Sequence, residues 1–279
     1  MGIMEFDLQT ERMIKANEVN WDARTPIHVA SEFYSVATRD PAEWFADYEW
    51  DDLGDLRGRE LAHLQCHIGS ETLAFAERGA RVTGLDLSGA SVRAAADIAV
   101  GRGLAVDYVQ SDVYSAADVL GRGRFDVVYT GKGALCFLPD LAPWAEQVSG
   151  LLKPGGVFYI VEFHPLLHAL GRVPDAETDL VIKHDYLAGR GHAREDGTYT
   201  YTDGSTVPES PEYFEWCHGL GEVITALIGA GLRITSIRES EEIPWRRWAS
   251  MENTRGVWHR LPRAAPRVPL LYAIKAVKS

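Results

Sequence analysis

Short apolar runs alternate with segments of helical spacing from about residue 59 onwards. Alternation of this kind is typical of β–α–β units, whose strands lie parallel in one sheet. The near-continuous apolar run at 157–165 suits a buried parallel strand. The predicted strands are residues 60–65, 81–88, 105–113, 125–132 and 157–165. The predicted helices are residues 70–79, 89–103 and 140–152, with glycines at or just beyond their ends.

The alternation of predicted strands and helices is interrupted between residues 166 and 216. There "LVIKHDYL" and "TYTYTD" alternate like two antiparallel strands on either side of "GRGHAREDG". The core then resumes with a helix over 219–231, a strand over 232–240, a Trp- and Arg-rich loop and a final strand over 269–278. The predicted organisation is a mostly helical extension (1–58), a core (59–165), an insertion that caps the core (166–216) and the C-terminal part of the core (217–279).

Composition narrows the range of partners. The chain of 279 residues carries 28 basic and 40 acidic residues, a formal net charge of −12, which repels a phosphate backbone. Nucleic acid is therefore a disfavoured partner. No stretch approaches the ~20 apolar residues that span a bilayer, and the N-terminus has no signal-peptide pattern. We expect no membrane partner and a cytoplasmic location, and a homodimer is compatible with the sequence.

The cysteines agree with that location. Cys66, Cys136 and Cys217 are too widely spaced to form a disulfide framework or a CxxC pair. A reduced compartment suits such a set.

The stretch "LAHLQCHIGSET" (61–72) raises the question of a metal site. His63 and His67 are four positions apart, a spacing that brings two ligands together only on a helix, and here it spans a strand end and a loop. Alternation along the strand points Leu61 and His63 to one face and Ala62 and Leu64 to the other. No metal is predicted.

The same stretch suits a cofactor loop. In an open parallel sheet, ligands bind beyond the carboxyl ends of the strands, where a turn leads into a helix. Asp86 ends the next strand, near the ~20-residue offset at which an acid binds ribose hydroxyls. Only Gly69 of the dinucleotide motif G-x-G-x-x-G is present, and "TGKGAL" around Lys132 does not fit a phosphate loop. A ribose-bearing cofactor without phosphates is favoured.

The ordered set "LAHLQCHIGSETLAFAERGARVTGLDLS", "YVQSDV", "FDVVYTGKGAL" and "LLKPGGVFYIVEFHP" resembles the class I S-adenosylmethionine-dependent methyltransferases over residues 59–165. The resemblance implies an α/β fold with a Rossmann-like, seven-stranded, mostly parallel sheet and helices on both faces. It implies S-adenosylmethionine as cofactor and S-adenosylhomocysteine as product. In the family's first motif, acid-x-G-x-G-x-G, His63 takes the place of the acid, and Gln65 and His67 replace two glycines.

The resemblance also implies positions that contact the cofactor. Asp86 matches the ribose-binding acid and Leu87 an apolar neighbour of the adenine. Asp112, followed by Val113, matches the acceptor for the adenine amino group. The remaining matched positions, in the first loop, after the second strand and at the end of the fourth, are Gln65, Cys66, Gly69, Ser88, Thr130 and Gly131.

The extension's "NWDARTPIHVASEFY" resembles an N-terminal lid found in a subset of bacterial small-molecule methyltransferases. Its polar and aromatic members are Trp21, Arg24, His28 and Tyr34, and Arg24 is suited to a bidentate pair with the cofactor's carboxylate. The alternative is a surface helix that Trp21 and Phe33 merely anchor. We expect residues 12–40 to close over the cofactor.

Catalytic candidates lie on elements predicted to surround the cofactor. His164 directly follows the fifth strand, and Glu162 should share its strand face, so the two are candidates for an acid–base pair. His218 precedes the helix after the insertion, and Tyr34 belongs to the lid. Each histidine is equally compatible with a structural role.

The loop "PWRRWASMENTRGVW" combines aromatic residues with arginines, as single-stranded nucleic-acid sites do. The net charge favours instead a rim anchored by Trp245, Trp248 and Trp258, or a pocket for a flat aromatic molecule. The predicted function is methyl transfer to a small organic acceptor, with an aromatic or indole-like metabolite preferred. The alternatives are a non-catalytic binder of an adenosyl ligand and an RNA methyltransferase.

Overall fold

The computed structural model describes residues 6–170, 181–196, 198, 200–202, 206–207 and 212–279. Its centre is a seven-stranded sheet in the order β3-β2-β1-β4-β5-β12-β8. Strands β1 to β5 run parallel, and β12 lies antiparallel between β5 and β8. The bounds are β1 Glu60–Leu64, β2 Arg81–Asp86, β3 Val106–Gln110, β4 Phe125–Thr130, β5 Leu152–Phe163, β8 Leu232–Ser240 and β12 Leu271–Lys278. The predicted fold class is confirmed.

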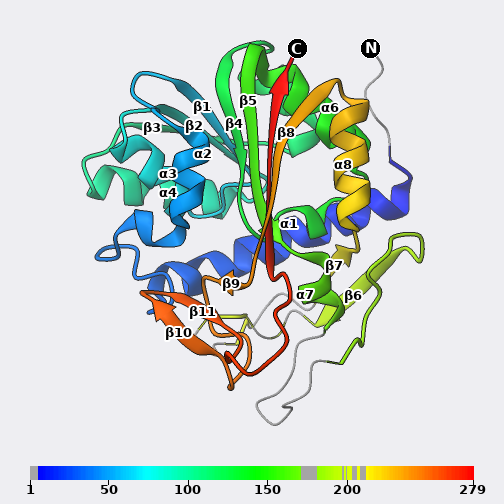
Figure 1. The fold of residues 1–279 in the computed structure, drawn as a ribbon. Coiled ribbons are helices and arrows are strands. Elements are labelled where there is room, and N and C mark those ends of the chain that lie inside the picture. The colour runs from blue at the N-terminus through cyan, green and yellow to red at the C-terminus, as the bar shows by residue number, and fades with distance from the viewer. Residues whose placement is uncertain (1–5, 171–180, 197, 199, 203–205, 208–211) are drawn as a thin grey trace.

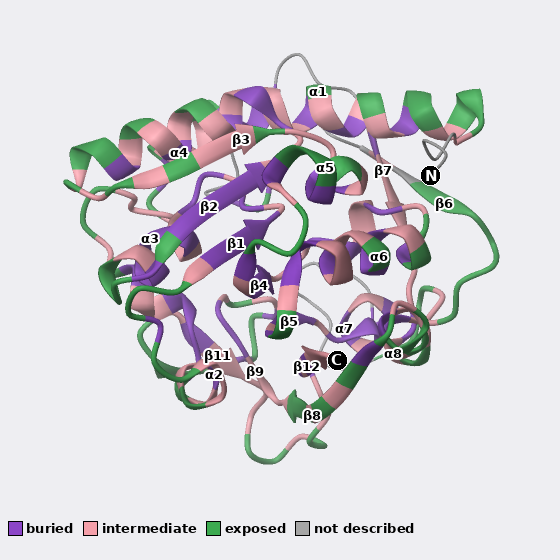
Figure 2. Ribbon diagram, turned by 90° about the horizontal axis from the view of Figure 1, so that it is seen from above, coloured by how far each residue is buried: buried purple, intermediate pink, exposed green. Residues whose placement is uncertain are grey.

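Helices cover both faces of this sheet. The first hydrophobic cluster joins α5 (Ala116–Leu120), α6 (Leu141–Leu151) and α8 (Leu220–Gly229) to one face. The second joins α2 (Asp47–Leu53) and α3 (Ser70–Glu77) to the other, and α4 (Gly89–Gly101) packs beside β2 and β3. Figure 2 shows β1, β2 and β4 buried between these layers and β8 largely exposed at the sheet's edge.

Strand alternation places the first strand as predicted. Leu61 belongs to one cluster, and Ala62 and Leu64 belong to the other. The His63 ring contacts Phe75 on the same side as Leu61. The imidazole is therefore buried under α3.

The extension is helical, as predicted, and α1 (Leu8–Ala30) crosses the carboxyl ends of the parallel strands (Figure 1). Its buried residues are mostly polar and recur on one helix face: Asn17, Asn20, Arg24, Thr25 and His28, with Met13. A helix that buries polar groups must offer them hydrogen-bond partners. Asn17 bonds the backbone of Phe214 in both directions, at 2.9 and 2.7 Å. The 3₁₀ turn η1 (Pro41–Trp44) follows α1.

The insertion contains a two-stranded antiparallel sheet, but its strands are β6 (His192–Asp196) and β7 (Glu212–Trp216). The predicted strands were wrong. Residues 181–187 and 200–202 carry no strand, and Leu180, Tyr199 and Asp203 lie outside the described residues. Strands β6 and β7 sit at the same end of the molecule as α1 and the short helix α7 (Pro165–Ala169) (Figure 1).

The Trp- and Arg-rich segment was predicted as a loop, and it forms a small antiparallel sheet of β9 (Glu242–Ile243), β10 (Glu252–Arg255) and β11 (Trp258–Arg260). Trp248 and Trp258 are buried anchors, as the rim interpretation requires. Of the helices in the described part of the chain, none is long and apolar enough to cross a membrane.

Candidate cofactor and acceptor site

A cavity of about 640 Å³ is lined by residues of α1 and of the loops at the carboxyl ends of the central strands. That volume is typical of a pocket for a small molecule or cofactor. Its walls come from α1, from the loops after β1 to β4, from residues 200–201 and 213–215, and from residues 244–247.

The loop after β1 holds left-handed backbone at three alternate positions. Gln65 has φ 55°, His67 has φ 51° and Gly69 has φ 76°. A residue with a side chain in this conformation costs about 1–3 kcal/mol, so surrounding contacts must hold the loop. The Gln65 amide donates to the Ala134 carbonyl at 2.8 Å, and the His67 backbone N–H donates to Asp86 at 2.7 Å. Side-chain contacts thus maintain a loop shape that glycine adopts more easily.

Two carboxylates stand at adjacent strand ends. Asp86 is the last residue of β2 and accepts from the N–H groups of His67 and Ser88, at 2.7 and 2.9 Å. Burial raises the pKa of Asp86 to about 6. Asp112 accepts from the Tyr114 N–H at 2.8 Å, and burial raises its pKa as well. Both carboxylates line the cavity.

Helix α1 is fixed over this end of the sheet. Asp22 accepts from the Ser88 hydroxyl at 2.6 Å and from the Ala90 N–H at 3.0 Å, at the start of α4. Thr25 lies 2.7 Å from the hydroxyl of Ser91 on the same helix. These bonds fix α1 to the start of α4.

Arg24 brings a buried positive charge into the wall of the cavity. The residue is 4% exposed and lines the cavity, and its guanidinium lies over the Tyr213 ring at 4.4 Å. Its Nε and Nη2 atoms have no hydrogen-bond partner within the described residues. A buried donor without a partner costs about 1–3 kcal/mol. An anionic ligand group such as a carboxylate would fit here.

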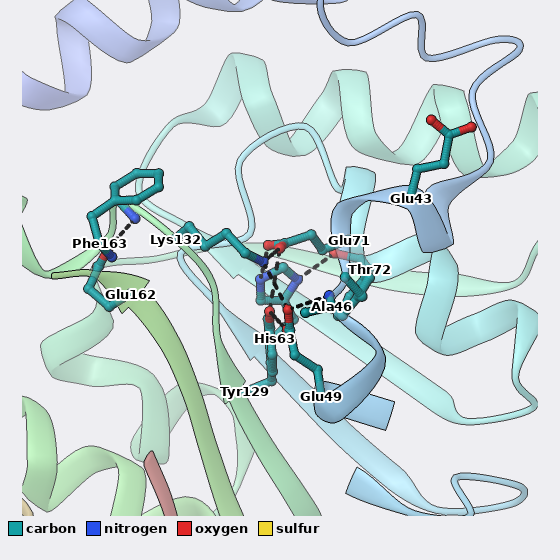
Figure 3. Close-up of polar contacts among 12 residues, drawn as sticks. Glu43, Ala46, Glu49, His63, Glu71, Thr72, Tyr129, Lys132, Glu162 and Phe163 are labelled. Carbon is teal, nitrogen blue, oxygen red and sulfur yellow. Dashed lines mark hydrogen bonds and ion pairs between the residues drawn. The ribbon is translucent and has the colours of Figure 1, made fainter. Parts of the chain in front are cut away.

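The wall of the cavity also contains a buried charged cluster (Figure 3). Lys132, just beyond β4, donates to Glu71 at 2.7 Å and forms an ion pair with Glu49 at 3.7 Å. The Tyr129 hydroxyl lies 3.4 Å from each glutamate. The His63 Nε2 atom is 3.9 Å from Glu71 Oε2. We call Glu49, Glu71, Lys132, His63 and Tyr129 the Lys132 cluster.

Burial and charge set the ionisation of these groups. Burial raises the pKa of Glu49 to about 7 and lowers the pKa of His63 to about 4. Burial alone would lower the pKa of Lys132, but the two glutamates outweigh it and the pKa is raised. At neutral pH the cluster therefore holds a cationic lysine and a neutral imidazole.

Aromatic side chains form the outer wall. The Trp245 and Phe163 rings meet edge to face with centroids 4.6 Å apart, and Phe33 lies 5.4 Å from Trp44. The Tyr34 hydroxyl bonds the Tyr201 hydroxyl. These residues line the cavity beside the Lys132 cluster.

Comparison with known proteins decides the family. The profile described as a methyltransferase domain matches residues 62–158. The ubiquinone biosynthesis O-methyltransferase of Azotobacter vinelandii is 30% identical over 174 residues, 62% of this chain and 68% of that protein. The enzyme of the same name from Alkalilimnicola ehrlichii is 33% identical over 141 residues, 50% of this chain and 53% of that protein. This chain belongs to the class I S-adenosylmethionine-dependent methyltransferases.

Solved structures agree on the fold. A putative S-adenosylmethionine-dependent methyltransferase from Listeria monocytogenes superimposes with a TM-score of 0.60 at 20% identity, covering 86% of this chain and 98% of that one. A second methyltransferase, from Mesorhizobium loti, gives 0.58 at 21% identity, covering 82% and 94%. The chain spans about half the length of the first curated relatives that it matches. The predicted family, fold and cofactor class are confirmed.

Most predicted cofactor residues line the cavity of this methyltransferase. They are Trp21, Arg24, Gln65, Cys66, Asp86, Leu87, Asp112, Val113 and Gly131. The others have structural surroundings. Ser88 caps α4 and Thr130 is fully buried. His28 lies 3.0 Å from His67 and 2.5 Å from the Thr200 hydroxyl, behind the wall.

Gly69 is also outside the lining, and its role is in the turn. It starts α3 with left-handed backbone, and the Tyr108 hydroxyl occupies the space that a Cβ atom would need. The prediction that Gly69 contacts the cofactor is therefore not supported by its position.

The predicted acid–base pair of Glu162 and His164 is wrong. The Glu162 carboxylate accepts from the backbone N–H groups of residues 133–135 and is 4% exposed. His164 instead caps α7 through Nδ1, at 3.1 Å from Leu166 N, and its Nε2 lies 3.0 Å from Glu239. His164 lies beyond the end of β5, as the N-cap of the helix that begins at Pro165. Neither residue lines the cavity.

His218 is likewise engaged elsewhere. Its Nε2 lies 2.7 Å from the Leu138 carbonyl and its Nδ1 lies 3.2 Å from Glu222. Among the predicted catalytic residues, only Tyr34 lines the cavity. The sequence analysis missed the Lys132 cluster, whose one visible signal was a lysine at the end of a buried strand.

Proposed function

We propose that this chain transfers a methyl group from S-adenosylmethionine to a small organic acceptor. The supporting observation is that one cavity contains two carboxylates at adjacent strand ends and a buried guanidinium whose Nε and Nη2 atoms have no hydrogen-bond partner among the described residues. Asp86 would accept from the ribose hydroxyls, Asp112 from the adenine amino group, and Arg24 would hold the carboxylate. These positions suit the ends of one extended adenosyl amino acid.

The lid assignment rests on α1. It is supported by the hydrogen bonds of α1 to α4 and β7 and by the position of Trp21 and Arg24 in the lining of the cavity. A lid excludes water and aligns two reactants, which accounts for much of the catalysis when a reaction needs mainly positioning. The cofactor supplies an electrophilic methyl group on a sulfonium. Residues of the lid and of the outer wall orient the acceptor toward it.

The acceptor would be aromatic, and an indole-like metabolite is included in this class. The wall of the cavity offers such an acceptor the flat apolar faces of Phe33, Tyr34, Trp44, Phe163 and Trp245. Aromatic pairs gain about 0.5–1.5 kcal/mol beyond the burial of their area. The name O-methyltransferase, carried by the relatives, favours a hydroxyl as the acceptor group.

Isothermal titration calorimetry with S-adenosylhomocysteine tests the cofactor assignment. We expect saturable 1:1 binding and weaker binding of NAD. Mass spectrometry would then follow methyl-labelled S-adenosylmethionine in reactions with phenols, catechols and indoles. Binding with no transfer to any acceptor, including cell extract, would favour a non-catalytic adenosyl-ligand binder. Tighter binding of NAD than of S-adenosylhomocysteine would refute the proposal.

A further inference from the structure

The Lys132 cluster has more acid than base. Glu49 and Glu71 share the single cation of Lys132, because the His63 imidazole is neutral near pH 7. The side chains are nearly enclosed, with exposed fractions of 0% for Glu49, 6% for Lys132 and 17% for Glu71. Buried charges are stable only when they are balanced. One further cation would balance the ionised cluster.

Glu71 is the member that can reach such a cation. It lines the cavity, whereas Glu49 lies behind it. Its Oε1 accepts from Lys132, and its Oε2 forms no hydrogen bond in the described part of the chain, lying 3.9 Å from His63 Nε2. Oε2 packs against the Cα of Gly131, where any side chain would overlap it. A carboxylate oxygen therefore faces the cavity at the ends of β1 and β4.

A separate observation indicates that the ligand also carries an anionic group. Arg24 lines the same cavity, and two of its buried donor atoms have no partner in the described part of the chain, so an anionic group of the ligand would fit beside it. Burial lowers the pKa of His67 to about 3, with a further contribution from Arg24. Partial burial raises the pKa of Tyr34, and Glu71 is among the charges that raise it further. The rings of His67 and Tyr34 lie 5.4 Å apart. Because the positive Arg24 acts on His67 and the negative Glu71 acts on Tyr34, these two opposite charges flank the same pair of rings.

We propose that Glu71 binds the α-ammonium group of the cofactor while Arg24 binds its α-carboxylate, so that the Lys132 cluster recognises the amino-acid part. This inference rests on the proposed function. Lys132 fixes the Glu71 carboxylate, and Glu49 supplies the additional negative charge. Glu71 thereby provides the acid that the first motif lacks, since His63 occupies the position of that acid.

Calorimetry with two ligands tests the inference. S-adenosylhomocysteine has the amino-acid group, and 5′-methylthioadenosine retains the adenosine and sulfur without it. Glu71→Gln should weaken binding of S-adenosylhomocysteine by about 10- to 100-fold, the range for a lost charged hydrogen bond. Binding of 5′-methylthioadenosine should remain within about twofold, below the energy of one neutral hydrogen bond. Glu77→Gln, the same change on the same helix but paired with Arg102, is the matched control and should alter neither.

A ligand-side measurement keeps the test independent of folding. Deaminated S-adenosylhomocysteine should bind the unmodified protein about 10- to 100-fold less tightly than the parent compound, and Glu71→Gln should weaken it no further. Equal loss for both ligands in Glu71→Gln, or no loss from deamination, would overturn the inference. If the unmodified protein bound neither S-adenosylhomocysteine nor 5′-methylthioadenosine, the proposed function itself would fail.

Discussion

The two ends of the cavity are built in different ways. At the adenosine end, Asp86 and Asp112 each bond a backbone N–H two residues further along the chain. At the other end, Lys132 meets Glu71 across 61 positions of sequence, and Glu49 comes from α2. The first end is a set of local turns at strand termini. The second exists only when α2, α3 and β4 have packed together.

This difference predicts which substitutions lower mainly the affinity for the cofactor and which also lower the free energy of unfolding. Each acid at the adenosine end is held by one or two backbone N–H groups and, within the described ranges, balances no buried charge, so its removal should cost mainly affinity. Removal of a charge from the Lys132 cluster leaves an unbalanced buried group, which costs free energy of folding as well. The following changes would break or sharpen this comparison.

The largest effect is expected for Lys132→Met. Breaking a buried ion pair by removing one partner typically costs about 3–5 kcal/mol, and here two carboxyl groups lose their cation. Urea denaturation at pH 8, above the pKa of about 7 that burial gives Glu49, should show this loss in the free energy of unfolding.

The double variant Lys132→Met/Glu71→Gln is the control for that loss. It removes one charge of each sign, so it should recover part of the stability. A loss below 1 kcal/mol for Lys132→Met alone would mean that the cluster behaves as a solvated surface pair.

Asp86→Ala should weaken S-adenosylhomocysteine binding by about 10- to 100-fold, because a charged acceptor for two hydroxyls is lost. Asp112→Ala should cost less, about two- to tenfold, since one bond to a neutral amine is lost. Calorimetry measures both, and unlike Glu71→Gln, these variants should also lose affinity for 5′-methylthioadenosine. Unchanged affinity in a folded Asp86→Ala protein would remove the ribose assignment.

The affinity for S-adenosylhomocysteine should fall about three- to tenfold as the pH drops from 8 to 6.5. Burial raises the pKa of Glu49 to about 7, so Glu49 is ionised above that pH and neutral below it. A neutral Glu49 removes the excess negative charge that attracts the ammonium group. The charged and titratable groups that interact with Glu49 are Lys132, Glu71, Tyr129, Tyr48 and Tyr159, and the Ala46 backbone N–H donates a hydrogen bond to it.

Glu49→Gln separates the two ends in this titration. The variant should lose the change between pH 8 and 6.5. It should retain a weaker change near pH 6, where Asp86 takes up a proton, because its raised pKa is about 6. An unaltered pH profile in Glu49→Gln would show that the cluster does not set the affinity.

The smallest effect on the site is expected for His164→Ala. Loss of its cap on α7 should lower the free energy of unfolding by about 0.5–2 kcal/mol. The affinity for S-adenosylhomocysteine should not change, because His164 lies outside the cavity. A large drop in methyl transfer at unchanged stability would restore His164 as a catalytic residue.

Hydrophobic periodicity determined the sheet and its helices. Each predicted core strand is present within about five residues of its expected bounds, because short apolar runs that alternate with helical segments are typical of parallel strands. The positions of Asp86 and Asp112 followed as well, since the carboxyl ends of adjacent parallel strands share one edge. The strands of the insertion were not predicted in this way. Alternation in residues 180–187 suggested a strand, yet the paired strands lie at 192–196 and 212–216.

The tertiary structure alone decided what each buried polar side chain meets. Local pattern indicates that Glu162 and His164 share a strand face, but the loop after β4 and helix α7 determine their partners. The polar face of α1 is buried because α4, β7 and the loop after β1 supply its hydrogen-bond partners. Lys132, Glu49 and Glu71 carry no joint signal in the sequence. Charge pairing acts over a few ångströms, and only packing brings residues so distant in the chain within that range.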